Sequence, residues 1–282
     1  MNAITEPRDL ASGHAQATGQ IDLKNVVVEF ASRDMRVRAV DGIDIAVAPQ
    51  SFTALVGPSG CGKSTVLNMV AGLLRPTEGT VTYAGKPVSG PNVRVGYMTQ
   101  KDTLLPWRTV EDNIGIAFEL ACRRIPRAEQ AERVREIIEL VGLKGFERHF
   151  PSELSGGMRK RAALARMLIY EPETLLLDEP FGALDAQLRL IMQEELLRLV
   201  ERRRMTVILV THDLEEAIAM SDRVLVFTSR PGRIRAVRDI PFERPRNPVE
   251  LRFRPEFGKL YEELWNELKH EVARGTETGL VK

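Results

Sequence analysis

The chain has 282 residues, enough for one large or two ordinary domains, and its 40 Lys and Arg residues nearly balance 39 Asp and Glu residues. Hydrophobic residues make up 43% and charged residues 28%, which is ordinary for a globular protein, and only two cysteines are present. This composition excludes a disulfide-stabilised mini-protein and a bulk-basic nucleic-acid binder. No apolar run approaches the roughly 20 residues of a membrane span, and the N-terminal sequence lacks a signal peptide's apolar core.

The first part of the chain predicts mostly strands. Residues 1–20 show no apolar period and are expected to form a mobile tail. Apolar residues at helical spacing over 65–71 predict a helix that stops at Gly72. A long loop is expected between the first two strands, up to Val40. The strand patterns lie at residues 22–30, 43–47, 51–56, 80–83 and 93–98.

The pattern is helical from about residue 105 to 170, and strands resume after it. A helix is predicted over 188–200, between the first two of these later strands. Strands that alternate with helices indicate a largely parallel sheet covered on both faces, so the helical block is expected to be an inserted subdomain. The later strand patterns lie at residues 175–178, 207–210 and 224–227.

The chain becomes rich in Arg and Pro after Ser229. Residues 229–258 contain eight Arg, four acidic residues and five Pro, and this stretch is expected to be a solvated surface. Nucleic acid is not expected as its partner, because no aromatic residues are interleaved with the basic ones. A final helix is predicted from an apolar stripe formed by Leu260, Tyr261, Leu264, Trp265 and Leu268.

A glycine-rich segment follows the strand at 51–56 and satisfies G-x-x-x-x-G-K-[ST] ahead of a predicted helix. Its glycines let backbone N–H groups point at phosphate oxygens; Lys63 would reach the β- and γ-phosphates, and the Ser64 hydroxyl would hold Mg²⁺. Cys61 is either a small filler or a thiol made reactive by the helix N-terminus. The segment comprises Gly57, Pro58, Ser59, Gly60, Cys61, Gly62, Lys63, Ser64 and Thr65.

Two further segments carry candidate chemistry. Asp178 and Glu179 end an apolar run, at the edge where open α/β sheets bind ligands. Asp178 is placed to complete a Mg²⁺ shell, and Glu179 to polarise an attacking water. Earlier in the chain, Ser155, Gly156 and Gly157 precede a helix and offer a hydroxyl and bare N–H groups to an anion. Alone, that segment would be an ordinary N-capped helix.

Together these segments resemble the ATP-binding subunits of ABC transporters, over about residues 21–230. Residues 57–65 are similar to the Walker A motif and residues 175–179 to Walker B. Residues 154–158 are similar to the signature, with Met158 where Gln is commoner.

The resemblance assigns roles to four more positions. Gln100 matches the Q-loop, which senses the γ-phosphate and Mg²⁺, and Asp185 matches the D-loop, which crosses a dimer interface. His212 matches the switch histidine. In the family this histidine lies beside the general base, which is Glu179 here. Phe30 would stack on adenine.

The resemblance also implies a fold and partners. The fold would be an α/β P-loop NTPase with a mostly parallel core sheet, an N-terminal antiparallel β subdomain and an inserted helical subdomain. An extension at 231–282 would follow. ATP and Mg²⁺ would bind to a head-to-tail homodimer, in which Ser155 and its glycines close over the ATP of the other chain. The assembly would lie peripherally at the cytoplasmic face of the inner membrane, under two permease subunits served by a solute-binding protein.

The stretch after Gln100 resembles importers of nitrate, aliphatic sulfonates and taurine, as does the Arg-Pro-Gly-Arg-Ile run at 230–234. The cargo stays open among such small solutes and a pyrimidine precursor. The apolar residues of the stretch after Gln100 would line the groove that receives the permease, unless Trp107 folds inward. These residues are Leu104, Leu105, Pro106 and Trp107.

Two other classes remain open from the sequence. One is a non-transport ABC ATPase of DNA repair or chromosome maintenance, although the sequence has no sustained coiled-coil heptads. The other is a P-loop NTPase outside the ABC family, in which Ser155 and His212 would have no role.

Overall fold

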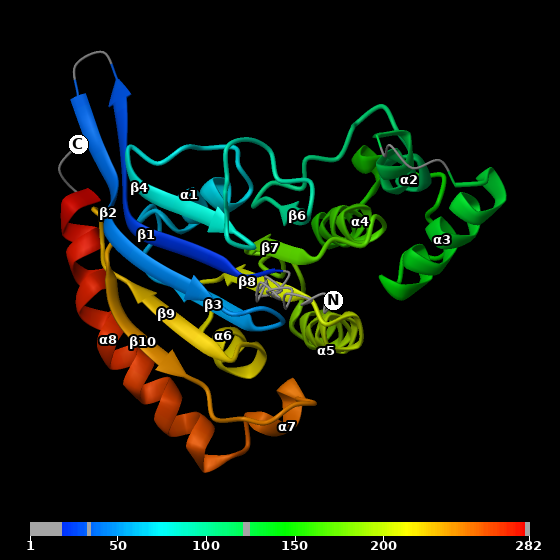
Figure 1. Ribbon diagram of the computed structural model, residues 1–282. Coiled ribbons are helices and arrows are strands. Elements are labelled where there is room, and N and C mark those ends of the chain that lie inside the picture. Colours follow the sequence, from blue (N-terminus) through cyan, green and yellow to red (C-terminus); the bar gives the residue numbers. More distant parts are fainter. Residues whose placement is uncertain (1–18, 33–34, 121–124, 280–282) are drawn as a thin grey trace, which may run out of the picture.

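The computed structural model describes residues 19–32, 35–120 and 125–279, so the tail predicted over 1–20 lies almost wholly outside the described residues. The chain forms two sheets with helices around them (Figure 1). Within the described ranges, no helix combines the length and the apolar character that crossing a bilayer requires.

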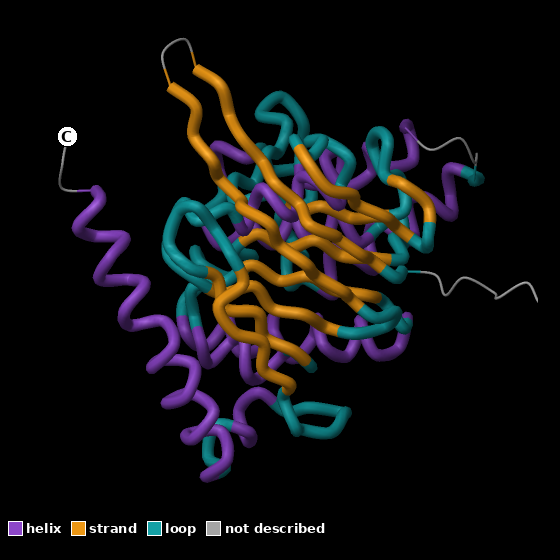
Figure 2. Tube along the Cα trace, turned by 60° about the vertical axis from the view of Figure 1, so that its left-hand side comes forward, coloured by secondary structure: helices purple, strands orange, loops and turns teal. Residues whose placement is uncertain are grey.

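The N-terminal sheet is antiparallel and has the order β2-β1-β4-β5. The long loop predicted up to Val40 is wrong, because both strands continue into a hairpin with Phe30 opposite Val37. A cross-strand ion pair between Arg38 and Glu29, 2.7 Å apart, supports this extension. Figure 2 shows the hairpin projecting beyond the sheet. The strands are β1 (Ile21–Ser32), β2 (Met35–Val47), β4 (Glu78–Tyr83) and β5 (Lys86–Pro87).

The core sheet has the order β10-β9-β3-β8-β7-β6, and its strands are parallel except for β10. The prediction of a mostly parallel core sheet beside an antiparallel one is confirmed. β3, β7 and β8 are buried along their whole length, as continuous apolar strands require. The sheet continues past residue 230 through β10. The strands are β3 (Phe52–Val56), β6 (Val95–Met98), β7 (Thr174–Asp178), β8 (Thr206–Val210), β9 (Arg223–Phe227) and β10 (Ile234–Asp239).

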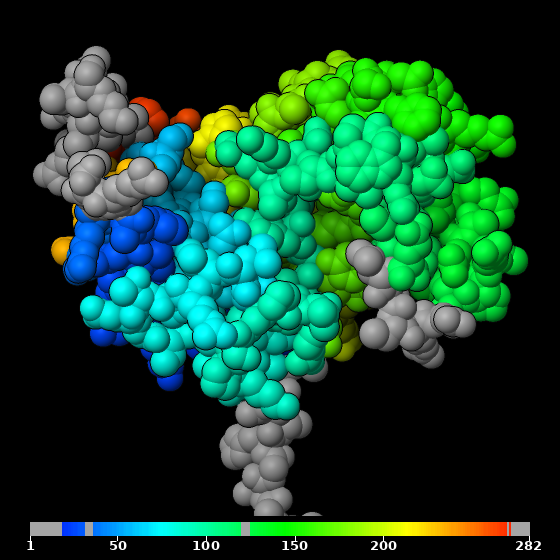
Figure 3. Space-filling model, turned by 90° about the horizontal axis from the view of Figure 1, so that it is seen from above, coloured from blue at the N-terminus to red at the C-terminus, as the bar shows by residue number. Residues whose placement is uncertain are grey.

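Helices lie around these sheets. α2, α3 and α4 pack on one another, on the side opposite the N-terminal strands (Figure 3). α8 lies along β9 and β10 and buries Phe257, Leu264 and Leu268 (Figure 1). A short 3₁₀ turn at Pro151–Glu153 precedes α4. The helices are α1 (Lys63–Val70), α2 (Val110–Leu120), α3 (Arg127–Leu140), α4 (Gly156–Leu168), α5 (Ala186–Arg203), α6 (Leu214–Met220), α7 (Pro248–Leu251) and α8 (Pro255–Gly279).

The basic stretch after Ser229 is solvated only in part: Arg230, Arg233, Arg235 and Arg254 are exposed, as the sequence predicted, whereas Arg246 is buried. Arg246 is only 7% exposed; it donates to the carbonyl oxygen of Phe242 and lies 3.0 Å from a carboxylate oxygen of Asp222. Arg235 of β10 pairs with Glu271 of α8 at 2.9 Å. Because a buried charge is tolerated only when it is paired, the buried Arg246 and the buried Glu271 each need their partner, and these contacts fix the C-terminal segment onto the core.

Candidate functional site

The glycine-rich segment turns from β3 into α1 as the motif predicts. Gly62 precedes the first helical residue, Lys63. Its φ is 104°, a backbone conformation that residues with a side chain rarely adopt. A Cβ atom at Gly62 would also come within 2.7 Å of Val40. Glycine is therefore required here for the turn that aims the N-terminus of α1 at a ligand.

Lys63 is held inside the curve of this segment. Its Nζ donates to the carbonyl oxygens of Gly57 and Pro58 at 2.8 and 2.7 Å, and the residue is only 7% exposed. The ammonium group is thus coordinated by oxygen atoms of the loop. Anionic oxygens of a ligand can replace these carbonyls, since they satisfy the same donors with a stronger, charge-assisted bond.

Cys61 is buried beneath the segment. It is 1% exposed, and burial raises the pKa of its thiol, although the nearby Lys63 ammonium opposes the rise. The interpretation of Cys61 as a reactive thiol is therefore wrong, because loss of hydration outweighs the positive charge.

Asp178 and Ser64 form a pair of oxygen ligands. Asp178 ends β7 and is 4% exposed, and the Ser64 hydroxyl is hydrogen-bonded to its carboxylate. Burial raises the pKa of Asp178, and the Ser64 hydrogen bond and the Lys63 charge oppose that rise. A buried carboxylate beside a hydroxyl is a donor set that suits a hard divalent cation such as Mg²⁺.

Glu179 lies between two side chains from distant parts of the sequence. Gln100 Nε2 donates to Glu179 Oε2 at 3.2 Å, and His212 Nδ1 lies 3.6 Å from Glu179 Oε1. Glu179 itself has a φ of 51°, an unusual conformation for a non-glycine residue that is found at functional sites. The side chain of His212 is 68% exposed, so water reaches this cluster.

Apart from His212, the charged and polar groups described above line one cavity of about 350 Å³. Phe30, which is 46% exposed, stands at its wall beside Val37. Gly57 and Pro58 line an adjoining groove with His212. The other predicted residues at the cavity are Ser59, Gly60, Gly62, Lys63, Ser64, Thr65, Gln100, Asp178 and Glu179.

Cys61 lines neither the cavity nor the adjoining groove, and four more predicted residues lie away from both: Ser155, Gly156, Gly157 and Asp185. Ser155 caps α4 by accepting a hydrogen bond from a backbone N–H at 3.2 Å, and Asp185 caps α5 in the same way at 2.9 Å. A Cβ atom at Gly157 would lie 3.0 Å from Leu184, so the two helix starts adjoin each other. Both caps are exposed and form a second polar surface.

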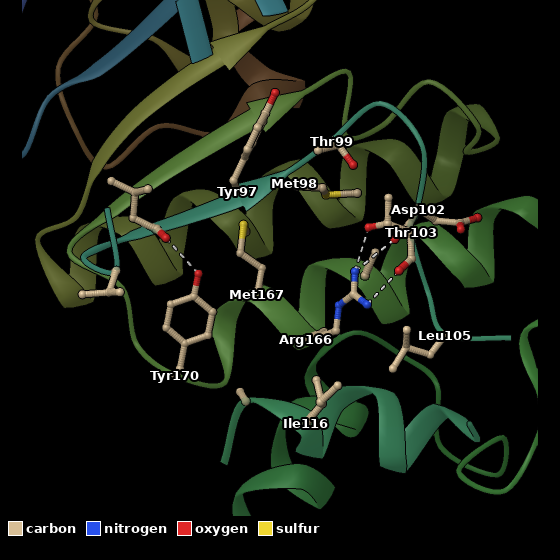
Figure 4. Close-up of a pocket in the computed structure, with 14 residues that line it drawn as sticks. Tyr97, Met98, Thr99, Asp102, Thr103, Leu105, Ile116, Arg166, Met167 and Tyr170 are labelled. Carbon is tan, nitrogen blue, oxygen red and sulfur yellow. Dashed lines mark hydrogen bonds between the residues drawn. The ribbon is translucent and has the colours of Figure 1, made fainter. Parts of the chain in front are cut away.

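A larger groove of about 570 Å³ lies between β6, α2 and α4. In Figure 4, Arg166 of α4 points toward Thr103, and its guanidinium donates to the Thr103 carbonyl and hydroxyl oxygens at 2.9 Å. Leu105 lines this groove. Leu104 is buried in the core, so its placement at the groove surface is wrong. Trp107 is 71% exposed beside the groove, and the alternative in which it folds inward is also wrong.

Comparison with known proteins decides the family. A family model described as "ABC transporter" matches residues 40–182. The chain belongs to the ABC transporter family. As a member, this ABC ATPase binds and hydrolyses ATP.

Curated relatives of this ABC ATPase extend over most of its length. An uncharacterised ABC transporter ATP-binding protein of Methanocaldococcus jannaschii, MJ0412, is 44% identical over 90% of this chain and 93% of the relative. The aliphatic sulfonates import ATP-binding protein SsuB of Bacillus subtilis is 40% identical over 85% of this chain and 91% of the relative. The nitrate import ATP-binding protein NrtC of Synechococcus elongatus is 41% identical over 83% of this chain but 36% of the longer relative.

Solved structures agree with the fold. The dimeric bacterial ABC transporter cassette MJ0796 is 28% identical, has a TM-score of 0.73, and is covered completely by 79% of this chain. A post-hydrolysis state of that cassette, bound to ADP and Pi, superposes equally well at 27% identity. The expected P-loop ABC ATPase fold is therefore confirmed.

Two residues of the ABC ATPase contact the site although the sequence analysis assigned them no role. Lys160 of α4 donates to the Gln100 carbonyl oxygen, and burial lowers the pKa of its ammonium group. Arg230 donates to the Gly60 carbonyl oxygen through Nε at 3.1 Å and Nη2 at 3.0 Å. Both contacts join residues that lie far apart in sequence, so spacing alone gives no signal for them.

Proposed function

We propose that this ABC importer ATPase powers uptake of a small anion of the sulfonate or nitrate type through partner membrane subunits. The observation that carries the catalytic part is the contact of Gln100 and His212 with Glu179, beside Lys63 and the Asp178–Ser64 pair. The substrate class rests on the names of SsuB and NrtC, whose cargoes are anions.

Each residue of the cavity has a place in the hydrolysis. Lys63 and the N-terminus of α1 would hold the phosphates of ATP, with adenine on Phe30. Ser64, Asp178 and Gln100 would hold Mg²⁺, which supplies positive charge to the phosphates. Glu179 would accept the proton of the water that attacks the γ-phosphate in line, and His212 would orient Glu179.

The site is incomplete within one chain. Ser155, Gly156, Gly157 and Asp185 lie outside the cavity, on an exposed surface of adjoining helix starts. In a head-to-tail homodimer this surface would close over the ATP of the other chain and supply hydroxyl and N–H donors to the γ-phosphate. ATP binding would then favour the dimer, and hydrolysis would release it.

The groove of Figure 4 would receive the permease subunits. Thr99 and Asp102, which line this groove, lie on either side of Gln100 in the sequence, so a partner seated there would touch the chain next to the proposed γ-phosphate sensor. Trp107 adds exposed apolar surface beside it. The assembly would lie at the cytoplasmic face of the inner membrane, and a solute-binding protein would act only through the permease.

A pair of variants tests the shared site. Ser155→Arg should reduce the rate of ATP hydrolysis by about 100-fold, because the Ser155 hydroxyl and the N–H groups beside it would stabilise the transition state. The same variant should keep the ATP affinity of the isolated chain within about two-fold of the parent. Lys63→Ala should weaken ATP binding in addition to hydrolysis. Undiminished hydrolysis by Ser155→Arg would mean that each chain hydrolyses ATP alone.

A growth experiment tests the cargo. Cells that lack this chain should lose growth on an alkanesulfonate as sulfur source or on nitrate as nitrogen source, and growth on both would contradict the substrate class.

A further inference from the structure

Arg230 differs from the next three arginines of the chain, each of which forms an ion pair with a carboxylate. Arg233 pairs with Asp41, and Arg235 and Arg238 both pair with Glu267. Among the residues that the structure describes, no carboxylate forms an ion pair with Arg230, whose guanidinium instead contacts the Gly60 carbonyl. Its positive charge is therefore available to an anion.

The position of Arg230 indicates that this anion is a nucleotide. Its side chain lines the same cavity as Lys63, Ser64 and Phe30, and it is exposed there. Two of its five N–H donors are used by the Gly60 carbonyl, which leaves a planar edge with donors for phosphate oxygens.

The loop that carries Arg230 is fixed on both sides. Gly232 donates to the Ala39 carbonyl at 2.9 Å, and a Cβ atom on it would lie 1.9 Å from the Cys61 carbonyl oxygen, so only glycine permits this approach to the phosphate loop. On the other side, the N–H and hydroxyl of Ser229 donate to Glu271 of α8 at 2.9 and 3.1 Å. The C-terminal helix thereby positions the loop.

We propose that Arg230 is a nucleotide-binding residue, which contacts the phosphates of ATP from its position at Gly60 in the cavity that Asp178 and Ser64 also line. Its loop is preorganised by β2 and α8, so little ordering is needed when the nucleotide binds. This inference rests on the proposed nucleotide site and adds to it a cation from outside the Walker A segment.

The test measures ATP affinity by calorimetry in EDTA, where no hydrolysis occurs, on the full chain. Arg230→Ala should weaken ATP binding about ten-fold, as expected for the loss of one charge-assisted hydrogen bond, and should make affinity less sensitive to NaCl. Arg230→Lys, which keeps the charge without the planar fork, should lie in between. Arg233→Ala, on the same loop but paired with Asp41, is the matched control and should change affinity less than two-fold.

Two outcomes would overturn the proposal. An Arg230→Ala affinity within two-fold of the parent would show that no contact exists, and equal losses in Arg230→Ala and Arg233→Ala would mean that the loop only supports the fold. Lys63→Ala separates this inference from the proposed function. If Lys63→Ala weakens binding and Arg230→Ala does not, only the inference fails; if neither weakens it, the nucleotide site itself is misplaced.

Discussion

Replacement of Glu216 by Gln should stabilise the protein at neutral and alkaline pH. Glu216 lies in α6, four residues after His212, and is 3% exposed. Burial raises its pKa from the ordinary 4.5 to about 7, and hydrogen bonds from Thr211 and Gln193 only partly oppose this. The Gln193 Oε1 atom is buried without a hydrogen-bond partner among the described residues, and an amide at position 216 can supply one.

The magnitude follows from the difference between the folded and unfolded pKa values. A rise from 4.5 to about 7 corresponds to about 3 kcal/mol, at about 1.4 kcal/mol per pH unit. Between these two values the folded chain retains a proton on Glu216 that the unfolded chain has lost. The stability of the parent therefore falls as pH rises from 4.5 to 7 and stays reduced above 7. Glu216→Gln removes that loss.

Urea unfolding at pH 5 and pH 8, without nucleotide, measures the effect. The variant should exceed the parent by up to about 3 kcal/mol at pH 8 and by much less at pH 5. Glu215→Gln, an exposed neighbour paired with Arg252, is the control and should change stability by less than about 1 kcal/mol at either pH. A difference between Glu216→Gln and the parent that is the same at both pH values would refute the reasoning.

Three further outcomes are expected. Arg246→Met should destabilise the chain by about 3 kcal/mol in urea unfolding, since buried carbonyls lose their donor, whereas a loss equal to that of the more exposed Arg244→Met would contradict the burial argument. In a Cys122→Ser background, Cys61 should react with iodoacetamide at pH 7.5 more slowly than a free peptide thiol, as its burial and raised pKa require; faster labelling would contradict this. Trp107→Ala should leave ATPase activity of the isolated chain unchanged but lower its co-purification with membrane subunits, and equal recovery would remove Trp107 from the docking surface.

Local patterns predicted the fold and much of the site. The segment around Lys63 combines backbone turn, helix start and chemistry within nine residues, so its position follows from sequence. Asp178 follows from the apolar strand that ends on it. The clustering of Gln100 and His212 at Glu179 came from the family resemblance, because the parallel sheet, not spacing, brings them together.

Tertiary contacts account for what the sequence did not predict. Arginines after Ser229 look like a solvated basic tail until β10 and α8 bring carboxylates such as Glu271 beside them. Cys61 could be judged reactive only while its burial was unknown. Arg230 has no local signal, since its contact with Gly60 spans 170 positions of the chain.

The central claim is that one chain holds half of each ATP site. The most direct measurement is the sedimentation of Glu179→Gln with and without ATP and Mg²⁺, since loss of the base should block hydrolysis and preserve the closed state. The expected result is a dimer with ATP and a monomer with ADP or no nucleotide. A Glu179→Gln protein that binds ATP and remains a monomer would contradict the claim.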